Sequence, residues 1–352
     1  MKVAFVSVVP SPYQRDLFRA LAQRSEIDLH VYYLEAASPD SPWPQRQLES
    51  YEEILRGFWF GIGSARCHVN WPLPDLRHFD LVVMNNIMSL TAQWLMRTVL
   101  RKKPWLFWGE RLGRGTALHQ QLTAPLHRAT GIAAIGSFAA DDYAARFPEP
   151  RHFCIPYFCD LDAFLAAPRH HREESRVVFL FCGQMIARKG VDLLLAAFQK
   201  LGPTACLLLV GREAELPQLL APLPAEVRER ITYAGFQAPE DLPRYFAQAD
   251  VFVLPSRYDG WGVVVNQALG AGLPIICSDM VGAGRDLVEE EINGLRFPAG
   301  DSATLTQKMQ RFLDEPQLCE RWGEASRERA SRWTPTAGAG KWVETFQTVI
   351  QA

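Results

Sequence analysis

Two short segments of this sequence combine glycines with charged residues in a way that suits phosphate binding. Residues 255–272 read PSRYDGWGVVVNQALGAG and stand between the apolar runs 251–254 and 274–277. Residues 183–190 read GQMIARKG, follow another apolar run and contain two adjacent cations. Glycines let the backbone turn sharply into a helix, and the free N–H groups at the helix start attract anions. One such turn also occurs without a ligand, but two of them in one chain favour a phosphate site.

Strands and helices alternate along the chain, which predicts an α/β protein with parallel sheets. The length of 352 residues suits two domains. We expect a domain over 1–165 and a second domain over 166–334, joined by a linker at 163–175. The apolar runs predict strands at 2–9, 28–34, 80–85, 104–109, 131–136, 152–156, 176–182, 205–210, 231–236, 250–255 and 274–277.

The composition excludes several other classes of protein. A net charge of −2 argues against a general nucleic-acid binder. The seven cysteines form no CxxC pair, which favours a reduced, cytoplasmic protein, and the eight histidines show no zinc-binding spacing. No apolar run approaches the ~18–20 residues that a membrane span needs.

The two glycine-containing segments together resemble the donor half of family 4 of the retaining glycosyltransferases. The matching pattern is strand, Gly-x5-Lys-Gly and an amphipathic helix, followed by Pro-Ser-x-x-acid-Gly-aromatic-Gly. The family includes bacterial enzymes of polysaccharide and lipopolysaccharide synthesis. The resemblance implies the GT-B architecture, in which two Rossmann-like domains face each other across a cleft. It also implies that the last helix, within 335–352, crosses back onto the first domain.

The resemblance implies roles for individual residues. Lys189 and Asp259 are the expected catalytic residues: Lys189 would bind the diphosphate, and Asp259 would contact hydroxyls of the transferred sugar. The N–H groups of Trp261, Gly262 and Val263 would hold the distal phosphate, and Gln267 would meet the ribose. The full donor-binding set is Gly183, Gln184, Arg188, Phe236, Gly260, Trp261, Gly262, Val263 and Gln267. No metal and no cofactor are expected.

Three positions depart from the family pattern. The usual pair of glutamates, with seven residues between them, is replaced by Asp259 and Gln267, and an expected arginine by Gln184. We therefore expect a retaining, metal-independent transferase that acts on a nucleotide-sugar donor and a glycan, lipid-linked or small-molecule acceptor. Two alternatives stay open: a non-catalytic nucleotide-sugar-binding protein of the same fold, and a nucleotide-sugar epimerase. Peripheral association with the inner face of a membrane also stays open.

Two further features have less specific interpretations. Residues 36–76 are rich in proline and aromatic residues and lack clear periodicity. They form either a lid or acceptor platform, or a hairpin that covers the edge of a core. Asp160 and Asp162 form a DxD sequence, which binds metal in other glycosyltransferases, but here we expect a chance occurrence.

Overall fold

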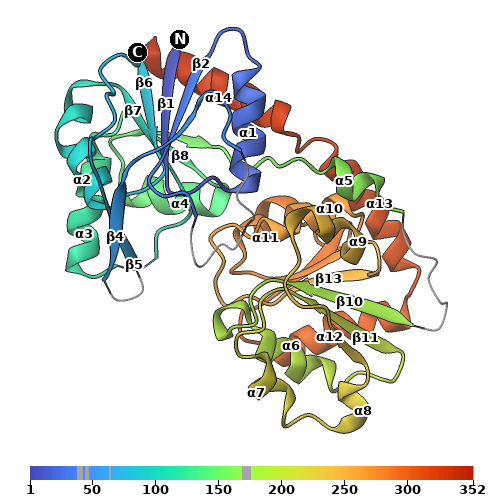
Figure 1. The fold of residues 1–352 in the computed structure, drawn as a ribbon. Coiled ribbons are helices and arrows are strands. Elements are labelled where there is room, and N and C mark those ends of the chain that lie inside the picture. Colours follow the sequence, from blue (N-terminus) through green and yellow to red (C-terminus); the bar gives the residue numbers. More distant parts are fainter. Residues whose placement is uncertain (38–42, 44–46, 63–64, 114, 169–175, 352) are drawn as a thin grey trace. The chain divides into compact units, whose positions relative to one another are not determined.

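The computed structural model describes residues 1–37, 43, 47–62, 65–113, 115–168 and 176–351. These residues form two compact units, of which the first comprises Met1–Cys159 with Pro335–Ala352 and the second comprises Asp160–Thr334. Each unit has its own parallel sheet flanked by helices, so the predicted α/β fold class is confirmed (Figure 1).

Unit 1 contains a seven-stranded parallel sheet in the order β3-β2-β1-β6-β7-β8-β9. The strands are β1 (Lys2–Ser7), β2 (Asp28–Tyr33), β3 (Glu52–Ile54), β6 (Leu81–Met84), β7 (Trp105–Gly109), β8 (Gly131–Ala134) and β9 (Arg151–Cys154). The helices are α1 (Pro12–Ala22), α2 (Leu90–Arg97), α3 (Ala117–Thr123), α4 (Ser137–Arg146) and α14 (Pro335–Ile350), with 3-10 turns at Val99–Lys102 and Ala124–Arg128.

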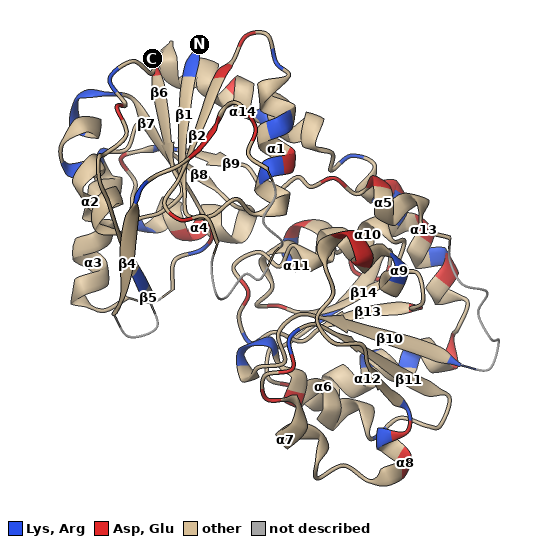
Figure 2. Cartoon of the chain, in the orientation of Figure 1, with Lys and Arg blue, Asp and Glu red and all other residues tan. Residues whose placement is uncertain are grey.

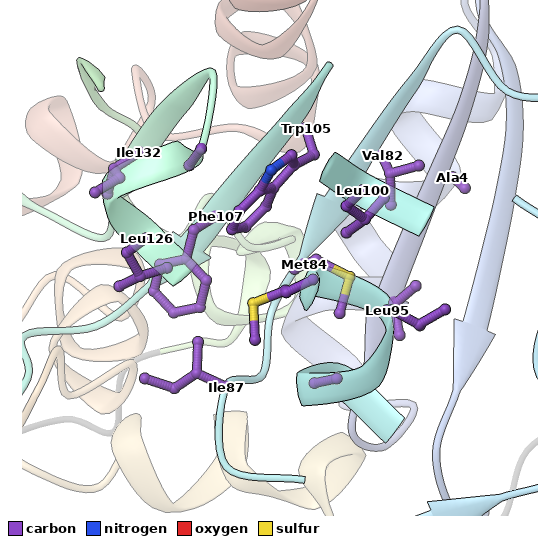
Figure 3. Close-up of a cluster of buried hydrophobic side chains, with 14 of the residues drawn as sticks. Ala4, Val82, Met84, Ile87, Leu95, Leu100, Trp105, Phe107, Leu126 and Ile132 are labelled. Atoms are coloured by element: carbon purple, nitrogen blue, oxygen red, sulfur yellow. The ribbon is translucent and has the colours of Figure 1, made fainter. Parts of the chain in front are cut away.

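The central strands of unit 1, β1, β6, β7 and β8, bury both of their faces, as apolar runs in a parallel sheet require. One face of the sheet carries Ala4 and Met84 into a cluster with Phe107 and with Leu95 of α2 (Figure 3). On β1 the neighbouring residue Phe5 belongs to a second aromatic cluster, because successive side chains of a strand point to opposite faces.

The C-terminal helix α14 completes this second cluster. The ring of Phe5 lies 5.3 Å from that of Trp342, and the Trp342 ring lies 5.4 Å from that of Trp108. Trp342 and Phe346 are fully buried. The last helix is therefore part of the core of unit 1, although unit 2 separates the two in the sequence.

Unit 2 contains a six-stranded parallel sheet in the order β12-β11-β10-β13-β14-β15. The strands are β10 (Val177–Cys182), β11 (Ala205–Val210), β12 (Ile231–Tyr233), β13 (Val251–Leu254), β14 (Ile275–Ser278) and β15 (Gly294–Phe297). The helices are α5 (Asp162–Ala166), α6 (Val191–Phe198), α7 (Leu216–Leu220), α8 (Ala225–Arg228), α9 (Leu242–Phe246), α10 (Val264–Gly270), α11 (Gly282–Leu287), α12 (Ser302–Asp314) and α13 (Leu318–Ala330), with 3-10 turns at Ala187–Lys189 and Pro239–Asp241.

Part of the aromatic segment forms a hairpin, as one of the alternatives predicted. Strands β4 (Gly57–Ile62) and β5 (Ala65–Asn70) pair as an antiparallel hairpin. Before them, β3 joins the edge of the main sheet, which we did not predict. Its sequence, Glu-Glu-Ile, has no apolar pattern, and its buried Glu52 is compensated by Arg15. The parts of the segment at 38–42, 44–46 and 63–64 lie outside the described residues.

The linker prediction was wrong at its start. Residues that we expected to be irregular form α5, whose Phe164 is buried and contacts the ring of Phe246 at 5.3 Å. The remaining positions 169–175 lie outside the described residues. No helix among the described residues is both long enough and apolar enough to cross a membrane.

Candidate functional site

The strand order of unit 2 reverses its direction of growth between β10 and β13. From β10 the chain adds β11 and β12 on one side, and then returns to place β13, β14 and β15 on the other. The loops that leave β10 and β13 therefore diverge, and ligands of open α/β sheets bind at such a switch point. Lys189 lies in the loop after β10 and Asp259 in the loop after β13.

A glycine fixes the distance between these two loops. Gly190 adopts a left-handed conformation, with φ of 73°. A Cβ atom at this position would lie 2.1 Å from the carbonyl oxygen of Pro255, which is a backbone atom and cannot swing away. The N–H of Arg257 donates to the carbonyl of Arg188 at 2.9 Å. The first loop therefore lies directly against the residues that leave β13.

The two expected catalytic residues contact each other. The ammonium group of Lys189 donates a short hydrogen bond to the carboxylate of Asp259. Asp259 is buried, and Ser256 Oγ donates to its Oδ2 at 3.4 Å. The guanidinium of Arg188 lies 4.0 Å from Asp259 Oδ1 and donates to the carbonyl of Tyr258 at 3.0 Å. All three charges therefore belong to one cluster.

This pairing gives Lys189 a structural role that the sequence did not indicate. Its side chain is only 15 % exposed and neutralises a buried carboxylate. Breaking a buried ion pair from one side leaves an uncompensated charge, which costs more than the loss of a surface contact. Lys189 therefore contributes to the stability of the switch point as well as to its charge.

The loop at 259–263 is held by the start of α11. The N–H of Asp259 donates to the carbonyl of Met280 at 3.0 Å, and the N–H of Gly282 donates back to the carbonyl of Asp259 at 3.1 Å. A Cβ atom on Gly282 would lie 2.3 Å from the carbonyl oxygen of Gly260. Gly282 and Gly260 thus pack backbone against backbone, and the loop has a defined position before α10 begins.

Trp261 anchors this loop through its side chain. The indole is fully buried, and its Nε1 donates to Asn266 Oδ1 at 2.9 Å. Gly262 follows with φ of 89°, a conformation that glycine adopts without strain. The N–H groups of Trp261, Gly262 and Val263 donate no hydrogen bond to any other described residue. The side chain is therefore structural, whereas the three amides have no partner within the described chain.

Gln267 lies one turn into α10. Its N–H donates to the carbonyl of Val263 at 3.3 Å, so the helix continues directly from the loop. Its side-chain oxygen Oε1 is buried and has no hydrogen-bond partner. An unpaired buried carbonyl is costly, and such a group in a native fold calls for an explanation. A ligand hydroxyl would provide the missing donor.

The remaining donor-binding candidates lie along the same edge of the sheet. Gly183 follows β10, and its N–H donates to the carbonyl of Val210 at 2.9 Å. A Cβ atom on Gly211 would lie 1.9 Å from the carbonyl oxygen of Gly183, so the exits of β10 and β11 touch. Gln184 comes next in this loop. Phe236 follows β12, two strands from β10, and its ring is 45 % exposed.

The sequence did not reveal a second ion pair at the switch point. Arg257 donates from its two terminal nitrogens to the two oxygens of Asp192, at 2.7 and 2.6 Å. This hydrogen bond from Arg257 holds the pKa of the Asp192 carboxyl below its ordinary value. The pair ties the first turn of α6 to the loop after β13. Arg257 stands within the segment that we singled out, but its partner 65 positions away has no local signal.

Unit 1 also reverses its strand order, between β1 and β6, but the groups there are neutral. Gln14 donates to Asn85 Oδ1 at 3.0 Å, and Asn85 donates to the carbonyl of Trp108 at 2.7 Å. The hydroxyls of Ser7 and Ser11 are buried and have no partner among the described residues.

Two other features of the described residues have structural explanations. The carboxylate of Asp160 accepts the N–H of Asp162 at 3.0 Å, which is the local turn that Asp side chains commonly form with the backbone two residues on. No group of three or more His, Cys, Asp or Glu side chains that could hold a metal occurs in the described part of the chain. Burial raises the pKa of the Cys182 and Cys277 thiols to about 12, which leaves both unreactive at neutral pH.

Comparison with known proteins finds a family model that matches most of unit 2. Residues 166–329 match the model described as glycosyl transferases group 1. The chain is 28% identical to alpha-D-kanosaminyltransferase of Streptomyces kanamyceticus over 43% of its own length, and 30% identical to D-inositol 3-phosphate glycosyltransferase of Jonesia denitrificans over 54%. These matches span 40% and 50% of the two relatives, so the chain matches only about half of their length or less.

Solved structures resemble the chain over its whole length. Sucrose-phosphate synthase from Thermosynechococcus elongatus superposes with a TM-score of 0.77 at 21% identity, covering 100% of this chain and 99% of that one. HepE of Anabaena superposes with a TM-score of 0.75 at 16% identity, covering 99% and 100%. At these identities the likeness concerns the fold, and the predicted GT-B architecture with two Rossmann-like domains is confirmed.

Proposed function

We propose that the protein transfers a sugar, of the hexose type, from a nucleotide-diphosphate sugar to a hydroxyl of a glycan, lipid-linked or small-molecule acceptor. The observation that carries this proposal is the meeting of Lys189 and Asp259 at the switch point of unit 2, beside the unpaired amides of 261–263. Two comparisons support it: the family model that matches most of unit 2, and the structures of HepE solved with UDP and with UDP-glucose.

The diphosphate would rearrange the ion pair on binding. Before the donor binds, Asp259 neutralises Lys189, so this ion pair adds no net charge to the site. The oxygens of a diphosphate are stronger hydrogen-bond acceptors. The Lys189 ammonium would direct some of its three N–H donors toward them. Asp259 would then be available to accept hydrogen bonds from hydroxyls of the transferred sugar. Gln267 Oε1 would accept a hydroxyl of the ribose and lose its unpaired state.

The chemistry proposed is substitution with retention at the anomeric carbon. The acceptor oxygen forms a bond to this carbon while the bond from the carbon to the leaving phosphate oxygen breaks. The leaving diphosphate takes the proton of the acceptor hydroxyl, so no protein base is required. Lys189, and the amides of Trp261, Gly262 and Val263, would stabilise the charge that develops on the leaving group.

We also propose that transfer proceeds without a divalent metal. Lys189 and Arg188 would supply the positive field that a metal ion supplies in other transferases. Activity should therefore survive dialysis against EDTA. Complete loss of activity that manganese or magnesium restores would contradict this part of the proposal.

The direct test is a thermal-shift screen with UDP-, GDP-, ADP- and dTDP-sugars, followed by product analysis. A donor at about 100 times its dissociation constant adds about 2.7 kcal/mol of stability to the form that binds it. NMR of the glycoside formed from that donor should show the anomer of the donor. A stabilising donor without any transfer or hydrolysis would indicate a binding protein, and an epimerised donor would indicate an epimerase.

A further inference from the structure

Two stretches of unit 1 contain several cations and no acidic residue. The stretches 54–74 and 81–109 contain no Asp and no Glu. They include the hairpin β4–β5, helix α2 and the turn Val99–Lys102 that follows it. The Lys and Arg residues of these stretches are Arg56, Arg66, Arg97, Arg101, Lys102 and Lys103. In Figure 2 the blue of Lys and Arg marks the segment that follows α2.

The same elements expose most of the large apolar side chains that the described residues leave in solvent. Trp71, Phe58 and Trp94 are 77%, 65% and 60% exposed. The whole set in this region is Phe58, Trp59, Phe60, Trp71, Leu90, Trp94 and, on α3, Leu118. In unit 2, by contrast, only Phe236 and Ile292 are exposed to a similar degree among the described residues.

Hydrogen bonds join these elements into one surface. The N–H of Asn70, at the end of β5, donates to Thr91 Oγ1 of α2 at 2.9 Å. On the other side of α2, Arg97 donates to the carbonyl of Gln121 in α3 at 2.8 Å. Figure 1 draws the hairpin beside α2 and α3, in agreement with these contacts. Leu90, Trp94 and Arg97 recur at the spacing of one helix face, so α2 adds an apolar stripe that ends in a cation.

Arg66 of this region pairs with Glu35 at 3.0 Å, but other cations of the surface have no carboxylate partner among the described residues. Arg56, Arg101 and Lys102 are exposed and form no ion pair with a described residue. Lys103 donates to the carbonyl of Phe79, which carries no net charge. Unit 2 has cations of both kinds: Arg311 and Arg329 have carboxylate partners at 2.5 and 3.1 Å, whereas the exposed Lys200 has none among the described residues. The unpaired positive charge of unit 1 is therefore available to an anionic partner.

We propose that this surface, formed by Phe58, Trp59, Phe60, Trp71, Leu90 and Trp94 with Arg97, Arg101 and Lys102, docks the protein on an anionic lipid bilayer. Tryptophan and phenylalanine side chains are suited to the boundary between headgroups and acyl chains, while Lys and Arg are attracted by the negative surface potential. A second copy of the chain would bring the same cations and repel this surface. A neutral glycan would leave the cations without a partner.

The test is flotation of the purified protein with lipid vesicles, in the absence of any nucleotide sugar. Vesicles of equal parts phosphatidylcholine and phosphatidylglycerol should carry the protein upward, and vesicles of phosphatidylcholine alone should not. Binding should weaken as salt is raised, because the Debye length shortens. Since no donor is present, the result does not depend on the proposed transferase activity.

Substitutions on the proposed surface test whether these residues bind the vesicles. Arg101→Gln combined with Lys102→Gln should weaken binding to the anionic vesicles about 30-fold, and Trp94→Ser about 10-fold. The matched controls are Lys200→Gln combined with Arg332→Gln, and Ile292→Ser, all exposed on unit 2, and these should bind like the parent. All variants should keep the melting temperature and the donor-induced thermal shift of the parent.

Several results would overturn the proposal. One is no binding to anionic vesicles, and another is an equal loss in the control variants. Comparable binding to duplex DNA, lost in the same double variant, would indicate a general polyanion surface instead. A dimer in sedimentation that Trp94→Ser converts to a monomer would show that the surface contacts a second copy of the chain.

Discussion

The two sheets reverse their strand order in the same way, yet they place different chemistry at the reversal. In unit 2 the loops bring together Lys189, Asp259 and Arg188. In unit 1 the corresponding loops bring together the side-chain amides of Gln14 and Asn85. The shared topology fixes where a site forms, whereas the residues at the strand ends decide which ligand fits it.

Arg15, the cation that follows Gln14 in the sequence, is paired within the fold of unit 1. Arg15, on α1, donates to both oxygens of Glu52 at 2.8 and 2.6 Å. Burial lowers the pKa of Arg15 but the bonds and charge of Glu52 outweigh it, so the pKa of this guanidinium is raised above its ordinary value. Tyr33 donates to the same carboxylate at 2.7 Å. Arg15 is thus paired with Glu52 within the fold of unit 1, whereas Lys189 of unit 2 stands at the switch point itself, paired with Asp259.

The largest effect is expected from a substitution that separates the two loops of unit 2. Gly190→Ala forces a Cβ atom against the carbonyl oxygen of Pro255 in a left-handed conformation, so it should destabilise unit 2 by about 3–5 kcal/mol. Urea denaturation measures this loss. Gly202→Ala is the matched control, because a Cβ atom there meets nothing within 4 Å. Equal stability of the two variants would mean that Gly190 does not fix the loops.

The second change, at Lys189, tests its contribution to activity and its contribution to stability as two separate quantities. Lys189→Ala should reduce kcat/KM by about 30- to 1,000-fold, which corresponds to about 2–4 kcal/mol of lost transition-state stabilisation. It should also lower the free energy of unfolding by about 1–3 kcal/mol, because buried Asp259 loses its partner.

Combining Lys189→Ala with Asp259→Asn should recover most of this stability and none of the activity. A double-mutant cycle in urea and in transfer assays measures both quantities. Activity close to that of the parent in Lys189→Ala would show that Arg188 binds the diphosphate, or that this is not the donor site.

The third change tests the neutral character of unit 1. Asn85→Asp removes the N–H donor that binds the carbonyl of Trp108 and sets a carboxylate oxygen against it. We expect a loss of about 1–3 kcal/mol in the free energy of unfolding, with the dissociation constant of the nucleotide unchanged. Calorimetric titration with the nucleoside diphosphate checks the second point. A large loss of nucleotide affinity would mean that both switch points contribute to the donor site.

The smallest effect should come from Gln267→Glu, which adds a negative charge to the candidate site of unit 2. If Gln267 Oε1 accepts a ribose hydroxyl, a carboxylate in its place should bind about 5-fold tighter, since charge-assisted hydrogen bonds are about twice as strong. The unliganded protein should melt at a lower temperature, because the new charge has no partner before the donor binds. Unchanged affinity with lower stability would show that Gln267 does not reach the nucleotide.

Much of the fold could be predicted from local patterns, and the site only in part. Continuous apolar runs such as Val251–Leu254 are sufficient to indicate buried parallel strands. The glycines at 190 and 262 indicated turns, and both have positive φ. In contrast, β3 has no apolar pattern and forms because Glu52 meets Arg15 across the chain. Pairs such as Lys189 with Asp259 depend on the topology, which local spacing does not contain.

The return of α14 to unit 1 has a consequence for biosynthesis. Trp342 and Phe346 fill the cluster around Phe5 and Trp108, so the core of unit 1 stays incomplete until these residues leave the ribosome. All residues of unit 2 are synthesised before them. The half of the chain that is made first therefore receives its last core residues after all of unit 2 has been synthesised, and until then Phe5 lacks the contacts of Trp342 and Phe346.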